Sequence, residues 1–313
     1  MKTRIITGLL IFLFVLPFVA FGGHYMMAFV LILLGIGTYE FLNVMKKAFL
    51  DEIPLYIYIL SFIFGYLIIF DVPLYNIDST QTILELSLHN GVFDYSKGVL
   101  STFVINPIWI VGYVITLFTC SVFDKKFKIT YAMYTFTTIV YLALGLKGML
   151  YLRSLTAIVG DSDVNSTFGL LMLCYVLLVT CATDIFAYFG GMTCYKLLGE
   201  SKVHKLNERI SPKKTIEGTI VGTLLATTFG FFFGIYAINN GSYNKWYLML
   251  ILSFVLSITG QIGDLLLSAL KRHYRIKDFS NLLPGHGGVL DRIDSMLVNA
   301  IVAALFMALT HVS

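Results

Sequence analysis

The sequence predicts an all-α, polytopic integral membrane protein, built as a helical bundle of about nine transmembrane helices. Of its 313 residues, 58% are hydrophobic and only 13% are charged, whereas a soluble domain of this length carries roughly a quarter charged residues. The apolar residues also fall in runs close to the roughly 20 residues that a helix needs to cross a bilayer. In lipid only helices and closed barrels satisfy every backbone group, and a barrel would show short alternating segments instead.

Nine apolar segments along the chain are candidates for these spans. They are 5–22, 26–44, 54–70, 103–122, 129–149, 167–189, 217–238, 246–268 and 289–311. The first segment follows Lys2 and Arg4, as in a signal peptide, but no small-residue cleavage site comes after it and the next segment begins almost at once. We therefore expect it to be retained as a transmembrane helix.

The distribution of charge predicts the orientation. With the N-terminus in the cytoplasm, nine alternating spans place most of the 22 basic residues inside, as the positive-inside rule requires. The outer loop near 71–98 is instead mainly acidic. We expect a bacterial-type plasma membrane, with the C-terminus outside. The basic residues placed inside are Lys2, Arg4, Lys46, Lys47, Lys125, Lys126, Lys128, Lys196, Lys202, Lys205, Arg209, Lys213, Lys214, Lys271, Arg272, Arg275 and Lys277.

The two long basic cytoplasmic loops, 192–217 and 271–288, both belong to the C-terminal half. We therefore expect residues 1–150 to form a scaffold of transmembrane helices and residues 167–313 to form a catalytic region facing the cytoplasm. The four cysteines (Cys120, Cys174, Cys181 and Cys194) lie in or beside apolar stretches without the spacing of metal ligands. They are expected to be free, buried thiols.

Asp264 is the clearest ionisable residue inside a predicted span. Such a group costs several kcal/mol unless it is paired or hydrated, so it is read first as functional. Ser268 follows one helical turn later and Lys271 seven residues later, which places all three side chains on one helix face. The alternative is that Asp264 only reaches water or pairs with Lys271.

Asp291 and Asp294 open the last predicted helix at i, i+3 spacing, on one side of it. Carboxylates are favoured at a helix N-terminus, so capping accounts for one of the two. Asp264 and Asp291 come from antiparallel helices joined by one loop and could share a divalent cation. Mg²⁺ suits such a site because it binds a few carboxylates together with substrate phosphate oxygens.

The loop between these helices combines cations and glycines. Lys271, Arg272 and Lys277 stand beside carboxylates, a pattern that suits a metal–phosphate substrate. Gly287 and Gly288 precede a helix N-terminus, where backbone N–H groups can approach an anion closely. Taken alone, a basic loop is more often a topology signal or an anionic-lipid contact, and a Gly-Gly pair is more often a turn.

An earlier segment offers two further lysines and one more intramembrane acid. Ser211 and Pro212 predict a helix start, and Lys213 and Lys214 in its first turn would oppose the helix dipole, which indicates a bound anion. Asp184 interrupts another apolar run. It could be a metal ligand, a substrate contact or a partner of Lys213 or Arg292, and the sequence leaves these alternatives open.

The stretch from Ser268 to Asp294 resembles the complete signature of the phosphatidate cytidylyltransferases, also called CDP-diglyceride synthetases. The loop 210–218 and the stretch from Asp184 to Phe189 resemble further motifs of that family. The likeness is close over about 180–298, while the N-terminal half matches only as a series of spans. The matching signature positions are Ser268, Lys271, Arg272, Lys277, Asp278, Ser280, Leu283, Pro284, His286, Gly287, Gly288, Asp291, Arg292 and Asp294.

The resemblance implies that CTP and phosphatidate react to CDP-diacylglycerol and pyrophosphate, in phospholipid biosynthesis. It implies a divalent metal, Mg²⁺ or another, with Asp264 and Asp291 as its expected ligands, and leaves open a monovalent cation such as K⁺ beside it. Phosphatidate would enter from the inner leaflet of the lipid bilayer and CTP from the cytoplasm. No nucleic-acid partner is expected, and a homodimer is left open.

Metal and basic residues together would neutralise the phosphates, because such transfers are catalysed mainly by positioning and charge. Lys271 and Arg272 are the expected catalytic cations beside Asp264 and Asp291. The expected substrate-binding residues are Ser268, Lys277, Asp278, His286, Gly287, Gly288, Arg292, Asp294, Lys213, Lys214 and Asp184.

Two rival functions fit parts of the same pattern. A transporter would also contain intramembrane carboxylates and glycine-rich breaks, but the charged motifs are confined to the C-terminal half and no inverted repeat is visible. Another CTP-using or lipid-phosphate transferase, such as a polyprenol kinase, would share the chemistry without the uninterrupted signature.

Overall fold

The computed structural model describes residues 2–49, 52–70, 93–94, 99–100, 103, 105–155, 157–159, 163–165, 167–199, 203–238 and 246–310. Most of the predicted outer loop near 71–98 and Lys202 of the first basic loop lie outside these residues. The chain forms two compact units. Unit 1 comprises Met1–Leu155 and Tyr274–Arg292, and unit 2 comprises Thr156–His273 and Ile293–Ser313.

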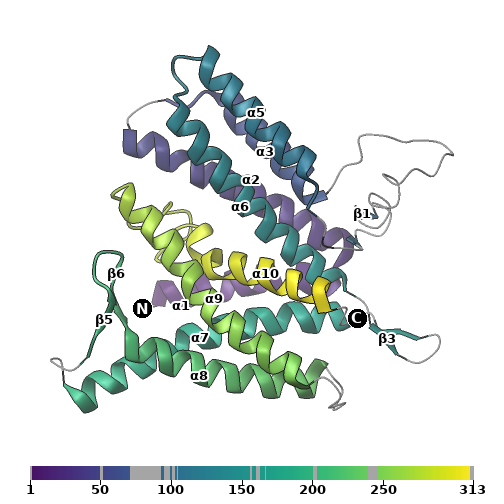
Figure 1. The fold of residues 1–313 in the computed structure, drawn as a ribbon, viewed down its shortest axis with the longest axis vertical. Helices are drawn as coiled ribbons and strands as arrows, with labels where there is room; N and C mark the ends of the chain where they lie inside the picture. Colours follow the sequence, from purple (N-terminus) through teal and green to yellow (C-terminus); the bar gives the residue numbers. More distant parts are fainter. Residues whose placement is uncertain are drawn as a thin grey trace. The chain divides into compact units, whose positions relative to one another are not determined.

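Unit 1 is a helical bundle organised around one central helix. Helix α6 packs against α2, α3 and α5, while α1 packs against α2 (Figure 1). The bounds are α1 (Lys2–Phe21), α2 (Gly23–Phe49), α3 (Leu55–Phe70), α5 (Pro107–Phe123) and α6 (Ile129–Ser154), with the antiparallel pair β1 (Phe93–Asp94) and β2 (Val99–Leu100).

Two basic side chains of α6 satisfy the carbonyl ends of neighbouring helices. Lys147 is fully buried and its Nζ donates to the Ile68 carbonyl, 3.3 Å away, near the end of α3. Arg153 donates through Nε to the Val19 carbonyl and through Nη2 to the Ala20 carbonyl, at 2.7 and 2.8 Å. The last carbonyls of a helix lack partners within it, so these bonds fasten α1 and α3 to α6.

Unit 2 contains the remaining helices and two hairpins. The helices are α7 (Phe168–Leu198), α8 (Ile216–Phe233, continued by a π-helical turn Gly234–Ile238), α9 (Trp246–His273) and α10 (Leu290–Thr310), whose first residues belong to unit 1. The hairpins pair β3 (Ala157–Val159) with β4 (Asp163–Asn165) and β5 (Lys205–Asn207) with β6 (Ser211–Thr215).

Small residues let α7 and α8 approach closely. A side-chain carbon added to Gly222 would lie 2.7 Å from the Cβ of Ala187, and one added to Gly218 would lie 2.7 Å from the Ala187 carbonyl. Polar side chains join other helices: Asn299 of α10 donates to Thr180 of α7 at 2.7 Å and accepts from Thr259 of α9 at 2.7 Å. Small contact residues and buried hydrogen bonds are how helices associate in lipid.

Each of the nine predicted apolar segments contains a helix in the described part of the chain. Six of these helices are long and apolar enough to cross a membrane, and the apolar stretches Ile6–Phe21 of α1, Leu55–Phe70 and Pro107–Phe123 are shorter. Large apolar side chains such as Phe12 and Leu224 are about 60% exposed, as expected of surfaces that face lipid. The all-α, polytopic membrane class is therefore confirmed, while nine crossings and the orientation stay predictions.

Several local predictions differ from the structure. Helix α7 continues to Leu198, well beyond 189, and α9 continues to His273, so that Lys271 and Arg272 lie in its last turn. Hydropathy ends where polar residues begin, but a helix can continue into the headgroup region, and cations suit a helix C-terminus. All four cysteines are free, yet none is fully buried: Cys181 is exposed, and Cys120, Cys174 and Cys194 are partly buried, because an apolar helix can turn small side chains toward lipid.

The helix start predicted at Ser211 is wrong. Residues Ser211–Thr215 form strand β6, and α8 begins at Ile216 with Thr215 as its cap, where the Thr215 hydroxyl accepts the Gly218 N–H at 3.1 Å. Pairing of Thr215 with Lys205 and of Ser211 with Asn207 extends this segment as a strand. Lys213 and Lys214 therefore do not lie in the first turn of a helix.

Candidate active site

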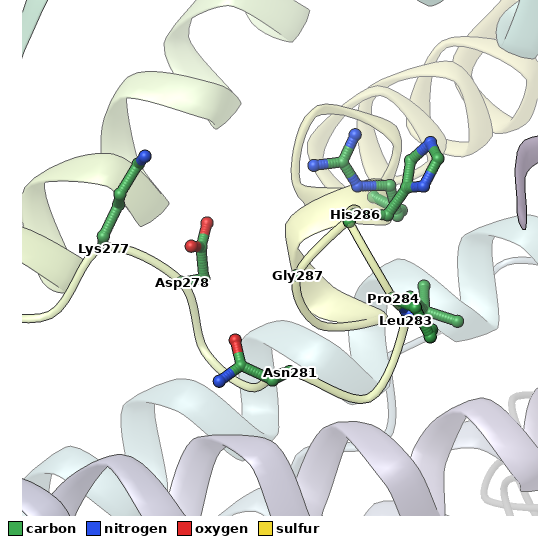
Figure 2. A pocket seen from close by; sticks show the side chains of 9 residues that line it. Lys277, Asp278, Asn281, Leu283, Pro284, His286 and Gly287 are labelled. Atoms are coloured by element: carbon green, nitrogen blue, oxygen red, sulfur yellow. The ribbon is translucent and has the colours of Figure 1, made fainter. Parts of the chain in front are cut away.

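A polar cavity of about 580 Å³ lies in unit 1, between the loop that follows α9 and the start of α10. Figure 2 shows the side chains of Lys277 and Asp278 on one side of this cavity and His286 on the other. Two cations, an imidazole, an amide and a carboxylate suit a phosphate-bearing polar ligand, because charge-assisted hydrogen bonds to phosphate are strong. The lining residues are Lys277, Asp278, Asn281, Leu283, Pro284, Gly285, His286, Gly287 and Arg292.

A tight turn presents His286 to this cavity. The Leu283 N–H donates to the Gly287 carbonyl, and the His286 N–H donates to the Leu283 carbonyl, both at 2.9 Å. The Nδ1 atom of His286 is buried, and within the described residues it has no hydrogen-bond partner. An unpaired buried polar atom costs about 1–3 kcal/mol, so a ligand that bonded this nitrogen would recover that cost.

Gly287 separates two carboxylates of the site. A side-chain carbon at this position would lie 3.1 Å from Asp291 Oδ2 and 3.4 Å from the Asp278 side chain. Its φ of +80° is also a conformation that favours glycine. The absence of a side chain at Gly287 thus leaves the space into which the Asp278 and Asp291 side chains point.

Asp291 fastens the loop to the start of α10. Its Oδ2 accepts the N–H groups of Phe279 and Gly288, both at 2.9 Å, and the carboxylate is buried. Phe279 is itself buried and packs edge-on against Phe41 of α2, with ring centroids 5.3 Å apart. Both donors precede α10, so these bonds of Asp291 close the loop and are not the helix capping that was expected for one of the two acids.

The beginning of the loop is held by an aromatic pair. Tyr274 packs edge-on against Tyr134 of α6, with ring centroids 4.9 Å apart. Burial raises the pKa of Tyr274, so its hydroxyl stays neutral at physiological pH. Tyr134 in turn donates to the Phe41 carbonyl of α2 at 3.0 Å.

Glu40 is a residue of this site that the sequence reasoning missed. It lies on α2 and is only 1% exposed. Its carboxylate accepts the Ser280 hydroxyl and the N–H groups of Val289 and Leu290. An acid in the apolar run 26–44 was the available signal, because an ionisable group in a predicted span is read first as functional. The N–H groups of Val289 and Leu290, just after the glycines at which an anion was expected, thus donate to the protein's own carboxylate.

Unit 2 contains a second group of charged residues from the predicted site. Lys214 of β6 forms an ion pair with Asp264 of α9, and the Ser268 hydroxyl donates to Asp264 Oδ1 at 3.3 Å. Lys271 is buried and interacts electrostatically with Asp264. The shared face predicted for Asp264, Ser268 and Lys271 is therefore present, and Asp264 also forms an ion pair with Lys214 from the hairpin.

Two more carboxylates lie within electrostatic range of Asp264. Asp184 of α7 interacts with both Lys214 and Asp264, and the buried Asp294 of α10 interacts with Asp264, Lys271 and Asp184. Lys214, rather than Lys213, is therefore the cation near Asp184. We refer to Asp184, Lys214, Asp264, Lys271 and Asp294 as the charged cluster of unit 2.

Lys213 and Arg272 differ from the charged cluster of unit 2 in their exposure. Both side chains are exposed. Successive side chains of a strand point to opposite faces, so the strand that directs Lys214 toward Asp264 directs Lys213 away from it. Arg272 lies on the outer side of the last turn of α9.

The donor chemistry of both units fits a divalent cation, although no preassembled ligand set is present. Carboxylate oxygens are the ligands that Mg²⁺ prefers, and the charged cluster of unit 2 offers three aspartates. Within the described residues, no three His, Cys, Asp or Glu side chains lie close enough together to hold a metal. Asp264 belongs to unit 2 and Asp291 to unit 1, so a metal shared between them stays a prediction.

Comparisons with known proteins agree with the family resemblance of the sequence motifs. A family model described as the cytidylyltransferase family matches residues 2–310. A phosphatidate cytidylyltransferase of Staphylococcus haemolyticus is 29% identical over 298 residues, and one of Staphylococcus epidermidis is 30% identical over 297 residues, each covering 95% of both chains. One of Bacillus subtilis is 45% identical over 130 residues, 42% of this chain and 45% of its own.

Proposed function

Because this chain belongs to the cytidylyltransferase family, we propose that it is a membrane nucleotidyltransferase that converts CTP and phosphatidate into CDP-diacylglycerol and pyrophosphate, in phospholipid biosynthesis. The observation that carries this proposal is the full-length similarity to relatives named for that reaction. It is supported by the polar cavity and the charged cluster, both of which suit phosphate groups.

In the proposed reaction, an oxygen of the phosphatidate phosphate attacks the α-phosphorus of CTP. A new P–O bond forms there, and the bond to the β-phosphate breaks, so that pyrophosphate leaves with the electron pair. The attacking phosphate is already ionised near neutral pH, and no general base is required to activate it. The protein's work is then to position two anions and to neutralise charge.

The cavity of unit 1 is the proposed place for the polar parts of the substrates. Lys277 and Arg292 line it as cations, and we assign them to phosphate oxygens. His286 presents a buried, unpaired Nδ1 that can bond to a substrate group, while Asp278 and Asn281 can orient it by hydrogen bonds. Gly287 and Gly288 keep the loop backbone close to Asp291 and Glu40.

The charged cluster of unit 2 is the proposed place for charge neutralisation at the reacting phosphates. Lys271 and Lys214 supply the positive charge, Ser268 holds Asp264, and Arg272 and Lys213 face outward where incoming anions would meet them. Asp184 and Asp294 offset the positive charge of the two lysines before substrate binds. A cluster of mixed charge of this kind can exchange its internal partners for substrate and metal.

We propose Mg²⁺ as the cofactor, held by Asp264 and Asp291, with K⁺ left open as a companion. When bound, the metal would neutralise phosphate oxygens and polarise the reacting phosphorus. Asp264 would have to exchange the Lys214 ammonium for metal, which would release that ammonium toward the phosphate oxygens. Asp291 would keep its loop contacts through Oδ2.

The helices place this chemistry at a membrane, and the bacterial relatives indicate the plasma membrane. We propose that the site faces the cytoplasm, where CTP is available, and that phosphatidate enters sideways from the inner leaflet. Residues 1–150 would serve as scaffold and 167–313 as the catalytic region, with residues 277–292 fastened to that scaffold. Whether the protein forms a homodimer is left open.

The deciding experiment uses the purified full-length protein in detergent–lipid micelles. It is given CTP labelled at the α-phosphate, phosphatidate and Mg²⁺, and we expect labelled CDP-diacylglycerol together with one pyrophosphate for each product. Replacing phosphatidate by a polyprenol, with CTP labelled at the γ-phosphate, tests the kinase rival. Absence of CDP-diacylglycerol with several metals and acyl chains, or transfer of the γ-phosphate to the polyprenol, would refute the proposal.

A further inference from the structure

Glu40 links the N-terminal half of the chain to the loop of the candidate site. Its carboxylate accepts the Ser280 hydroxyl at 2.6 Å, the Val289 N–H at 3.0 Å and the Leu290 N–H at 2.8 Å. These donors are 240 to 250 residues away along the chain. They come from the two ends of the segment that lines the cavity.

The surroundings of Glu40 fit a carboxylate closely. Burying such a group is costly unless hydrogen bonds compensate it, and here three donors do so. Two of them are N–H groups at the start of α10, which lack partners within that helix and carry partial positive charge. A side-chain carbon on Gly288 would lie 2.7 and 2.8 Å from the two Glu40 oxygens, so the glycine leaves the space that the acid occupies.

Two carboxylates together close the loop. Asp291 joins the Phe279 N–H to the Gly288 N–H, and Glu40 joins the Ser280 hydroxyl to the N–H groups of Val289 and Leu290. Residues 281–287, which include His286 and most of the cavity lining, lie between these two closures. The cavity is therefore shaped by a loop whose ends are pinned by one acid of its own and one acid of α2.

We propose that Glu40 is a positioning residue for cytidylyl transfer. It touches none of the groups assigned to substrate, but it holds closed the loop that carries His286 and ends at Asp291. This gives the N-terminal helices a role beyond membrane anchoring: α2 fixes the geometry of the catalytic loop. The inference rests on the proposed function for its kinetic consequence, while the loop closure itself can be measured without activity.

The test compares the full-length protein with its Glu40→Gln variant. Glutamine keeps the length and one acceptor oxygen, but its NH₂ group replaces the other oxygen. An NH₂ group cannot accept a backbone N–H, so at least one of the hydrogen bonds from Val289 and Leu290 is lost. We expect kcat to fall by tenfold or more, because small misplacement of reacting groups is costly, with a much smaller change in KM for CTP. Hydrogen–deuterium exchange of the amides within 288–290 should become at least tenfold faster.

Glu52→Gln is the matched control. Glu52 is exposed and lies between α2 and α3, and this variant should keep wild-type kcat and exchange. Ser280→Ala removes one donor of the same closure, so its effect on kcat should not add to that of Glu40→Gln, as expected for groups in one network.

Two results would overturn the inference. Unchanged exchange across 279–290 in Glu40→Gln would show that the acid does not close the loop. A lower melting temperature with a normal kcat for each folded molecule would reduce Glu40 to a structural role. If the wild-type protein forms no CDP-diacylglycerol, the proposed function fails, and the exchange data still decide whether Glu40 closes the loop.

Discussion

The charge of Asp291 can be separated experimentally from its hydrogen bonds. Its Oδ2 accepts two N–H groups that close the loop, and a neutral amide oxygen accepts such bonds as well. The negative charge supplies what a neutral amide cannot, such as holding a divalent metal. Asparagine at this position therefore keeps the fold contacts and removes the proposed catalytic property.

We predict that Asp291→Asn lowers kcat by at least about a hundredfold, the scale of losing one electrostatic contribution to a transition state. The variant should still be extracted, remain monodisperse and melt within a few degrees of the wild type. Steady-state assays over a range of Mg²⁺ concentrations measure the effect. Asp264→Asn is expected to lose activity on the same scale.

Asp291→Ala provides the comparison for this prediction. Alanine removes the acceptor as well as the charge, so exchange of the Phe279 and Gly288 amides should accelerate in Asp291→Ala and stay near wild type in Asp291→Asn. Near-normal turnover of Asp291→Asn at every Mg²⁺ concentration would remove this residue from the proposed metal site.

At the scale of one element, two adjacent lysines of strand β6, Lys213 and Lys214, have different surroundings. Lys214 reaches Asp264, whereas Lys213 is exposed, because side chains alternate along a strand. Lys214 lies among the acids of the charged cluster of unit 2, where it can exchange Asp264 for a phosphate oxygen. Its neighbour can reach an anion only from the solvent side.

We therefore predict that Lys214→Gln reduces kcat/KM by ten- to a hundredfold, while Lys213→Gln reduces it several-fold at most. Loss of a buried, charge-assisted contact costs more than loss of a solvated one. Lys205→Gln, at an exposed position of the partner strand β5, serves as the control and should leave kcat/KM unchanged. Equal losses in the two neighbouring lysine variants would contradict the role that strand alternation assigns to Lys214.

The helices were predictable from the sequence, but their ends were not. Apolar runs located every helix described here, because lipid exposure demands long hydrophobic segments. The strand at Ser211–Thr215 was mistaken for a helix start, because Ser211 and Pro212 are favourable there and the pairing with Lys205 and Asn207 has no local signal. Helix α7 continued past its apolar run for a related reason: polar residues in the headgroup region can still be helical.

The candidate site shows the same division. Asp264, Ser268 and Lys271 were predictable as neighbours, because helix periodicity alone brings them together. The bond from Lys214 to Asp264 and the closure by Glu40 depend on contacts between elements far apart in the chain. No local pattern encodes such contacts. The residue types of the site could therefore be predicted from the sequence, but their partners could not.

At the scale of the whole molecule, the number of membrane crossings decides which side the chemistry faces. Within the described residues, six helices satisfy the length and composition of a span, whereas Leu55–Phe70 and Pro107–Phe123 have 16 and 17 residues, or about 24–26 Å at the rise of an α-helix. The hydrocarbon core is about 30 Å thick, and a short helix can still cross by thinning the bilayer locally. Nine crossings and six crossings therefore make different, testable predictions.

We predict that the N-terminus and residue 275 lie on the same, cytoplasmic side, because eight crossings separate them if all nine helices span. If only the six longer helices span, five crossings separate the two positions and they lie on opposite sides.

Single cysteines at residues 2, 85 and 275, the second in the segment outside the described residues, are introduced after the four native cysteines are replaced. Intact cells and inverted vesicles are then treated with a membrane-impermeant thiol reagent. Labelling of 2 and 275 only in inverted vesicles, and of 85 in intact cells, is the expected pattern; labelling of 275 from outside would place the site away from cytoplasmic CTP and refute the orientation.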